Sequence, residues 1–141
     1  MANYFTNFSL ALSLPNEAAQ AYALDLAHQA DQRRQGDPLA ENFPPALADL
    51  IEDWNFETEA DGPAAEHGLW LHSDNGGVDA LCAFLQHLLQ KFDPNGRVTF
   101  EWSHDCSKPR LDAYGGGAAI VTAQEIKTMN TSQWLAEHTT P

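Results

Sequence analysis

The sequence predicts an α+β fold, an antiparallel sheet with helices packed mainly on one face, in a split β-α-β (ferredoxin-like) variant. Segments 8–14 and 98–104 alternate large apolar residues with polar or small ones, which is the period of a half-buried strand. Residues 78–92 instead place apolar side chains three and four positions apart, as an amphipathic helix does. The 141 residues suffice for a single domain, 1–141, with one core.

The first third of the chain predicts a strand followed by two helices. Strand 7–14 ends at Pro15, a residue that suits the first turn of a helix. The helix that follows ends near Gly36, because one face repeats apolar residues up to that point: Ala19, Tyr22, Ala23, Leu26, Ala27 and Ala30. A linker, 37–45, then leads to a short helix over 46–54 with acidic residues on its outer side.

The middle of the chain predicts a hairpin and the central helix. Segments 55–59 and 68–72 are two strands joined by a long loop with a turn at Asp61-Gly62-Pro63. The helix over 78–92 carries a wide apolar stripe, so a charge at Leu85 is expected to unfold the protein.

The last third predicts two strands and a helix. After a turn at 93–96, a strand covers 98–105, and the chain is irregular up to Gly117 before a short strand over 118–121. Thr122-Ala123-Gln124-Glu125 matches a capping box, which predicts that a C-terminal helix starts there. Trp134 and Leu135 then form a last helical turn against the body.

Charge is distributed very unevenly. The whole chain has a net charge of -13, and between Gln35 and Gln90 it holds eleven Asp and Glu residues without a single Lys or Arg. Such a surface repels phosphates, so direct partners among nucleic acids and anionic membranes are not expected. No apolar run approaches a membrane span and no signal segment is apparent, so a cytoplasmic location is expected. Cys82 and Cys106 are expected to be two free thiols.

Only incomplete motifs suggest chemistry. His104-Asp105-Cys106 has the residue types of a nucleophilic or metal site, but on a strand Asp105 points away from the other two. No second His or Cys pair has ligand spacing, and the Asp-Asn-Gly and Asp-Pro-Asn-Gly turns lack the twelve-residue calcium pattern. We therefore expect no catalytic residue, metal or cofactor.

The loop from His104 to Gly117 is one candidate ligand site. Lys108 and Arg110 supply its positive charge, either for an anionic ligand or as counter-ions of Asp105 or Asp112. A strand follows Gly115-Gly116-Gly117 where a phosphate loop requires a helix, so a bulge or backbone crossing is the simpler interpretation. The ligand-binding set predicted here is His104, Cys106, Lys108, Arg110 and Gly116.

The acidic segment is the other candidate. Its carboxylates either form an ordinary solvated face or present spaced negative charge to a protein that normally grips a phosphate backbone. The predicted partner-binding residues are Asp49, Glu52, Asp53, Glu57, Glu59 and Asp61.

Residues 100–110, 114–123 and 129–134 form three stretches of distinctive sequence, and Gly68-Leu-Trp-Leu-His72 is a fourth. Together they resemble a family of small proteins of undetermined activity that are encoded by phages, plasmids and bacterial genomes. This resemblance implies an accessory protein of a mobile element and assigns no functional residues. The first hypothesis is thus an acidic, non-enzymatic interaction module, for example a counter-defence protein that binds a basic protein surface. The alternatives are a small-ligand binding protein or enzyme that uses the 104–117 loop, and a homodimer formed through a sheet edge or the Trp134 helix.

Overall fold

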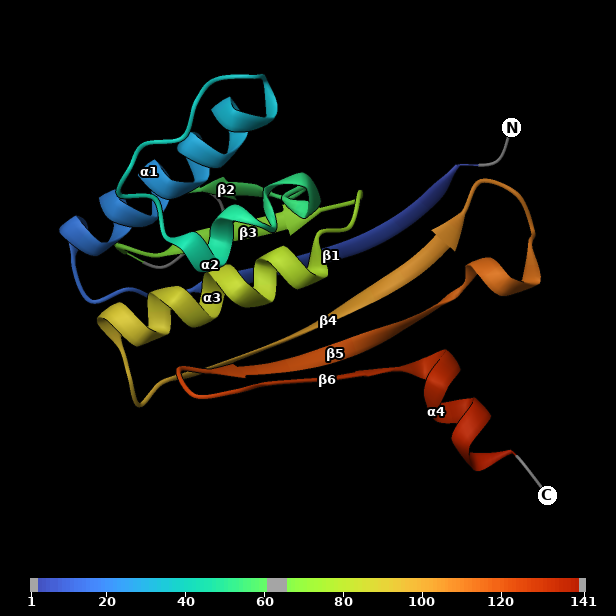
Figure 1. Ribbon diagram of the computed structural model, residues 1–141. Coiled ribbons are helices and arrows are strands. Elements are labelled where there is room, and N and C mark those ends of the chain that lie inside the picture. Colours follow the sequence, from blue (N-terminus) through green and yellow to red (C-terminus); the bar gives the residue numbers. More distant parts are fainter. Residues whose placement is uncertain (1–2, 61–65, 140–141) are drawn as a thin grey trace.

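The computed structural model, which describes residues 3–60 and 66–139, contains one six-stranded antiparallel sheet (Figure 1). In chain order the elements are β1 (Tyr4–Leu12), α1 (Glu17–Arg34), α2 (Pro45–Ala48), the 3-10 turn η1 (Ile51–Asp53), β2 (Glu57–Glu59), β3 (Leu69–Ser73), α3 (Val78–Phe92), β4 (Arg97–Cys106), the 3-10 turn η2 (Leu111–Ala113), β5 (Gly115–Thr122), β6 (Ile126–Asn130) and α4 (Thr131–His138).

The strand order is β2-β3-β1-β4-β5-β6, and every neighbouring pair is antiparallel. The chain passes from β1 to β2 through α1, and β3 lies between these two strands. It passes from β3 to β4 through α3, and β1 lies between those. β5 and β6 then extend the sheet beyond β4 as a meander. The predicted α+β class with an antiparallel sheet is therefore confirmed.

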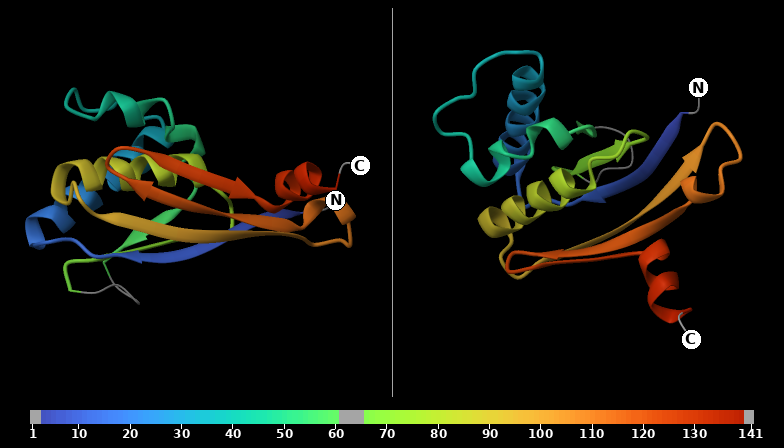
Figure 2. Two further views of the ribbon diagram at one scale, coloured as in Figure 1. Left: turned by 90° about the horizontal axis from the view of Figure 1, so that it is seen from below. Right: turned by 45° about the vertical axis from the view of Figure 1, so that its right-hand side comes forward.

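Helices α1, α2 and α3 cover one face of the sheet at one end, whereas β4, β5 and β6 run on beyond α3 (Figure 2). Under the helices lies a single core in which Leu71 of β3, Leu85 of α3 and Val121 of β5 are fully buried. The apolar stripe of α3 faces this core, because Leu81, Leu85 and Leu88 have no solvent exposure. Burying a leucine side chain stabilises the fold by about 1.5–3 kcal/mol. The prediction of the central helix over 78–92 is confirmed.

The capping-box prediction was wrong. Thr122 and Glu125 close the hairpin between β5 and β6, where the Thr122 N–H donates to the Glu125 carbonyl at 2.9 Å. The Thr122 hydroxyl accepts from the Glu125 N–H at 3.1 Å, as in a helix cap, but the chain then pairs with β5 as β6. A helix cap and this hairpin turn share the same local hydrogen bond, so it does not distinguish them. Pairing of the following residues with β5 selects the hairpin. The helix begins only at Thr131.

Three smaller differences concern boundaries, and one of them is that the short helix predicted over 46–54 is divided into α2 and η1. The glycines Gly115-Gly116-Gly117 belong to β5 and not to an irregular loop. The first strand starts at Tyr4 and ends at Leu12, and the predicted turn at 61–63 lies outside the described residues. Cys82 is buried, Cys106 is half-buried, and neither forms a disulfide. No helix among the described residues is long and apolar enough to cross a membrane.

Candidate functional site

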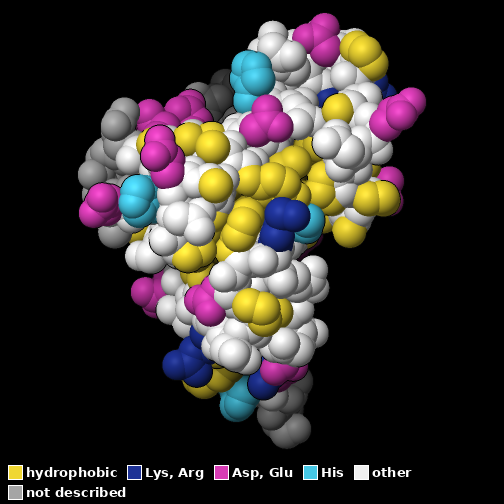
Figure 3. All heavy atoms as spheres, turned by 90° about the vertical axis from the view of Figure 1, so that its left-hand side faces the viewer, with side chains coloured by type: hydrophobic (Ala, Val, Ile, Leu, Met, Phe, Trp, Pro, Cys, Tyr) yellow, Lys and Arg dark blue, Asp and Glu magenta, His cyan; other side chains and the backbone are white. Residues whose placement is uncertain are grey.

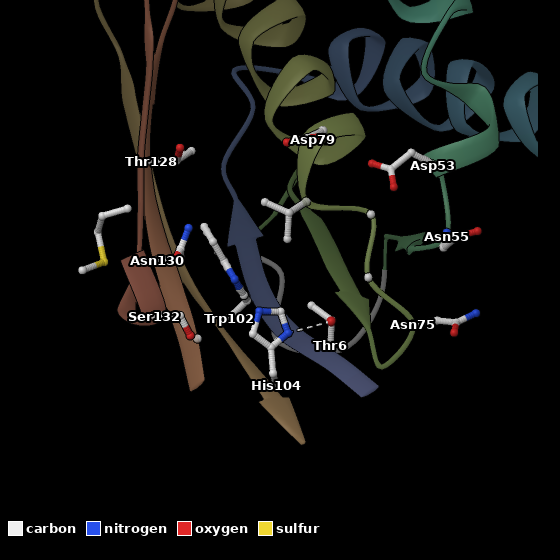
Figure 4. A pocket seen from close by; sticks show the side chains of 15 residues that line it. Thr6, Asp53, Asn55, Asn75, Asp79, Trp102, His104, Thr128, Asn130 and Ser132 are labelled. Carbon is white, nitrogen blue, oxygen red and sulfur yellow. Dashed lines mark hydrogen bonds between the residues drawn. The ribbon is translucent and has the colours of Figure 1, made fainter. Parts of the chain in front are cut away.

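A cleft of about 500 Å³ opens on the helix side of the sheet, beyond the N-terminal end of α3 (Figure 4). Strands β1 and β4 supply its floor. The loop before α3, with residues that follow η1, forms one wall, and β6 with the start of α4 forms the other. Its volume lies within the ~300–1,000 Å³ that small-molecule sites occupy.

The floor consists of Thr6, Trp102 and His104. They share one face because β1 pairs with β4 with Thr6 directly opposite His104, and because alternate residues of β4 point the same way. The Thr6 hydroxyl and Nδ1 of His104 are hydrogen-bonded at 2.9 Å. Both side chains are half-buried. The imidazole is thus held by a specific partner while it remains accessible from the cleft.

The first wall depends on Gly77, the residue before α3. Gly77 has a φ of 96°, and a side chain there would lie 2.8 Å from the carbonyl oxygen of Asp53. Only glycine therefore permits this close approach of two backbone segments. The Asp53 carboxylate accepts a hydrogen bond from the Ala80 N–H at 3.0 Å and so caps α3 from a distant part of the chain. Gly76 extends the wall by donating its N–H to the Thr6 carbonyl at 3.1 Å.

The opposite wall is formed where β6 passes into α4. Asn130 accepts from the Gln133 N–H at 2.7 Å and caps α4, and Ser132 follows in the first turn. The Thr131 hydroxyl accepts from the Gly116 N–H at 3.0 Å, which attaches this wall to β5. Thr128 completes the wall from β6. The chain reaches this position only because it forms a strand after Thr122.

The cleft is polar and acidic. Asp53 and Asp79 contribute carboxylates, and the other lining side chains are mainly hydroxyls, amides and one imidazole. None of the described residues that line it is Lys or Arg. An anionic ligand would therefore meet two carboxylates without a compensating cation. The indole of Trp102 offers an apolar surface on which a sugar or another ring can stack.

The Thr6–His104 pair contains a hydroxyl and a base at hydrogen-bond distance, which is part of what activates a nucleophile. Activation also needs a third group that orients the base. Within residues 3–60 and 66–139, no carboxylate is hydrogen-bonded to His104. The Thr6–His104 pair therefore supplies two of the three groups of such an arrangement.

The structure divides the predicted 104–117 set. His104 and Gly116 line the cleft, whereas Cys106, Lys108 and Arg110 do not. Lys108 and Arg110 are exposed, and among the described ion pairs neither contacts Asp105. Sequence reasoning missed most of the other lining residues because they are scattered along the chain, among them Thr6, Asn55, Asp79, Asn130 and Ser132. The one local signal at the first wall was the glycine pair at 76–77, which was interpreted only as a turn.

The six acidic residues occupy separate places. Asp49 and Glu52 line a hollow together with Arg33 and Arg34, so basic groups lie nearby. Asp53 turns into the cleft. Glu57 and Glu59 lie on β2, and Asp61 is outside the described residues. On the face shown in Figure 3, acidic side chains are separated by apolar and uncharged atoms.

One further group has the donor types of a metal site. Glu57 lies directly opposite His72 in the β2–β3 pair, and Glu59 is two positions further along β2, so all three point to one face. Their ligand atoms lie within 4.8 Å of one another. His72 stacks on Trp70 with ring centroids 3.8 Å apart, and its Nε2 is 2.5 Å from the Glu59 carboxylate. These are donor types that bind divalent cations. Two of the three groups, the His72 imidazole and the Glu59 carboxylate, are already hydrogen-bonded to each other.

Comparisons of this chain with protein-family models, with curated proteins and with solved structures find no match.

Proposed function

We propose that this protein binds a small polar ligand without negative charge in the cleft between α3 and β6. The observation that carries the proposal is the lining itself, which combines His104, Asp53 and Asp79 with hydroxyls and amides around the indole of Trp102. Hydroxyl-rich or amine-bearing compounds match these groups, because carboxylates and amides accept hydrogen bonds from hydroxyls and ammonium groups. This is the ligand-binding hypothesis, with its site moved from the 104–117 loop to the cleft.

The test is a thermal-shift screen of the full chain with neutral sugars, amino sugars, nucleosides and polyamines, and with sugar phosphates as the anionic set. Compounds that raise the Tm are then titrated calorimetrically into the His104→Ala and Asp79→Asn variants. We expect each variant to bind about tenfold more weakly, equivalent to about 1.4 kcal/mol. Asp105→Asn is the matched control, because Asp105 neighbours His104 but alternates to the opposite face of β4.

Two results would contradict the proposal. One is that the uncharged and cationic compounds give no saturable binding. The other is that His104→Ala and Asp79→Asn bind every active compound as tightly as the original chain does.

The acidic interaction module is the second candidate. The observation that favours this function is a set of unpaired carboxylates. Among the described residues, no ion pair includes Asp49, Glu52 or Glu57, so no salt bridge neutralises their charge. In this role the protein would act in the cytoplasm as an accessory protein of a mobile element and bind a basic protein surface. Reversing all three to Lys should reduce capture of such a partner from a bacterial lysate. Reversal of Glu17, Asp25 and Glu101 is the control, and equal capture by both triple variants would refute the idea.

We also propose that β1, α1, β2, β3, α3 and β4 form a split β-α-β (ferredoxin-like) unit to which β5 and β6 are added. The strand order β2-β3-β1-β4 supports this, because each helical connection joins two strands that are separated by a third. A truncated chain ending after β4 would test whether this unit folds alone.

A further inference from the structure

The exposed apolar side chains of this protein are concentrated in its C-terminal part. Eight large apolar side chains are exposed among the described residues, and only Tyr4 lies outside the segment 111–135. Five of them belong to β5, β6 and α4: Ile120, Ile126, Met129, Trp134 and Leu135. Exposed large apolar side chains that gather in one part of a small protein can mark an interaction site. We call β6 and α4 together the C-terminal edge.

β6 is a free sheet edge. All five of its residues are exposed, and among the residues that the structure describes the strand pairs only with β5. Along an antiparallel strand, the backbone N–H and C=O groups of successive residues point alternately toward the paired strand and away from it. The hydrogen bond between Thr122 and Glu125 shows that the backbone groups of Glu125 point toward β5. The N–H and C=O groups of Ile126 and Thr128 therefore point away from β5. An edge with outward backbone groups is a template for one more strand.

α4 lies beside this edge with its apolar side chains exposed. In Figures 1 and 2 the helix leaves the end of β6 and lies beyond the free edge, on the side away from α1, α2 and α3. No residue of α4 is buried, and Trp134 and Leu135 are 50% and 53% exposed. An eight-residue helix is marginal in water without tertiary contacts. α4 is thus a short amphipathic helix whose apolar face needs a covering surface.

The low charge of the C-terminal edge indicates which kind of partner it can bind. From Ala113 to His138 the chain has two acidic residues, Glu125 and Glu137, and one basic residue, Lys127, which forms an ion pair with Glu125 at 3.4 Å. This stretch therefore has a net charge of -1, and the rest of the chain carries the other -12 of the total of -13. Two copies that approach through this weakly charged stretch meet little of the repulsion that the acidic remainder of the chain would cause. A cationic partner would instead be drawn to the acidic remainder of the surface.

We propose that a second copy of this chain covers the C-terminal edge, so that β6 pairs with β6 of the partner in an antiparallel, two-fold symmetric dimer. A two-fold centred on Thr128 pairs all five residues of β6 and places Thr128 opposite its own copy, a favourable cross-strand pair. It brings each α4 next to the partner's β5–β6 turn. A two-fold axis at Lys127 would place the two Lys127 side chains, which carry like charges, opposite each other. A two-fold axis at Ile126 would leave half of β6, and α4, without a partner.

The first test is the mass of the full chain by sedimentation and light scattering from about 1 to about 200 μM. We expect a species of twice the 15.5 kDa chain mass. Thr128→Pro removes an outward N–H without removing a hydrogen bond to β5, and Trp134→Lys charges the apolar face of α4. Each should raise the dimer dissociation constant about tenfold or more. Tyr4→Lys is the control, because it charges the one exposed large apolar residue outside segment 111–135.

The second test does not depend on how well the proline variant folds. In a Cys106→Ser background, Thr128→Cys should form an interchain disulfide on mild oxidation, because paired strand residues bring their Cα atoms to about 5.5 Å. Ile120→Cys, on the neighbouring strand, should remain monomeric on a non-reducing gel. A monomer across the whole concentration range overturns the proposal. So does a dimer that survives both Thr128→Pro and Trp134→Lys, or equal cross-linking at 128 and 120. These tests measure mass and cross-linking, whereas ligand binding in the cleft, which Thr128 also lines, is tested separately by the His104→Ala and Asp79→Asn variants.

Discussion

His87 and Tyr22 connect α3 with α1. The Tyr22 hydroxyl is 2.7 Å from Nε2 of His87, and the Lys91 ammonium lies 4.7 Å from the centre of the Tyr22 ring. Burial, and secondarily the charge of Lys91, lowers the pKa of His87 below its ordinary value, and burial raises the pKa of Tyr22. Both groups are therefore neutral at pH 7. The phenol can then donate its proton to the imidazole, an arrangement that protonation of His87 would reverse.

The first prediction is that stability falls in mild acid because of His87. In the unfolded chain its imidazole has an ordinary pKa of about 6.5, whereas the folded value is lower. As pH falls below about 6.5, the unfolded state binds the proton first, so stability is lost until pH has passed the folded pKa. Urea unfolding at pH 8 and 5.5 should show a larger loss for the original chain than for His87→Gln. His28→Gln, on the exposed side of α1, controls for the loss of an imidazole. Equal losses in all three would contradict the prediction.

Cys82 and Cys106 differ in their surroundings. Burial, and then the nearby carboxylate of Asp79, raises the pKa of Cys82 to about 11, so that its thiol stays protonated at neutral pH. Cys106 is half-buried at the end of β4. The thiolate is the reactive form, and Cys82 lacks both thiolate and access.

The second prediction follows from this difference. A maleimide at pH 7 should modify Cys106 in the folded chain and leave Cys82 unmodified until the protein unfolds. Mass spectrometry of labelled peptides, with Cys106→Ser as the single-thiol control, measures both rates. Modification of Cys82 as fast as Cys106 without denaturant would show that α3 is more open than the structure indicates.

At the scale of elements, the packing of β4, β5 and β6 depends on a glycine. Gly117 lies opposite Trp102 on one side and opposite Asn130 on the other. A Cβ at this position would overlap the indole ring of Trp102 and the carbonyl oxygen of Met129. The absent side chain therefore lets the Trp102 ring lie over β5 and reach the floor of the cleft. This close approach is a structural reason for glycine that the phosphate-loop interpretation did not supply.

The third prediction is that Gly117→Ala destabilises the protein by about 1–3 kcal/mol, because the indole ring and β6 must move apart. The free energy of unfolding in urea measures the effect. The matched control is Ala118→Ser, at the next position of β5, whose side chain points to the other face of the sheet. If Gly117→Ala were as stable as Ala118→Ser, the packing of Trp102 over Gly117 would be refuted.

At the scale of the whole molecule, the net charge of -13 opposes compaction. The described residues contain three ion pairs, two of which involve a histidine, so most carboxylates repel one another without local compensation. Added salt shortens the range of this repulsion from about 30 Å at 0.01 M to about 8 Å at 0.15 M.

The fourth prediction is that the Tm rises when NaCl is increased over this range at constant protein concentration. Sorbitol at equal osmolality is the control, because it lacks the screening effect. A Tm that is flat or falling in NaCl would mean that the carboxylates do not repel one another appreciably in the folded state.

The sequence by itself determined the features that depend on neighbouring residues. The alternation in 98–104 and the stripe in 78–92 predicted β4 and α3 correctly, because the periods of strands and helices are local properties. The order of the expected strands and helices likewise predicted the α+β class with its antiparallel sheet. Local patterns were least reliable where two structures share the same short-range hydrogen bonds, as at Thr122 and Glu125.

Only the tertiary structure decided where the functional groups lie. Thr6 and His104 are 98 positions apart, yet they are hydrogen-bonded because β1 pairs with β4 in one particular register. Strand pairing made β6 from a segment that a capping box assigned to a helix, and so created both a wall of the cleft and a free edge. Of the acidic residues that are neighbours in sequence, Asp53 lines the cleft, whereas Asp49 and Glu52 line a hollow with Arg33 and Arg34. The register of a strand pair, and the face to which each side chain points, depend on contacts between residues that are far apart in sequence. The spacing of apolar residues within one segment does not specify these contacts.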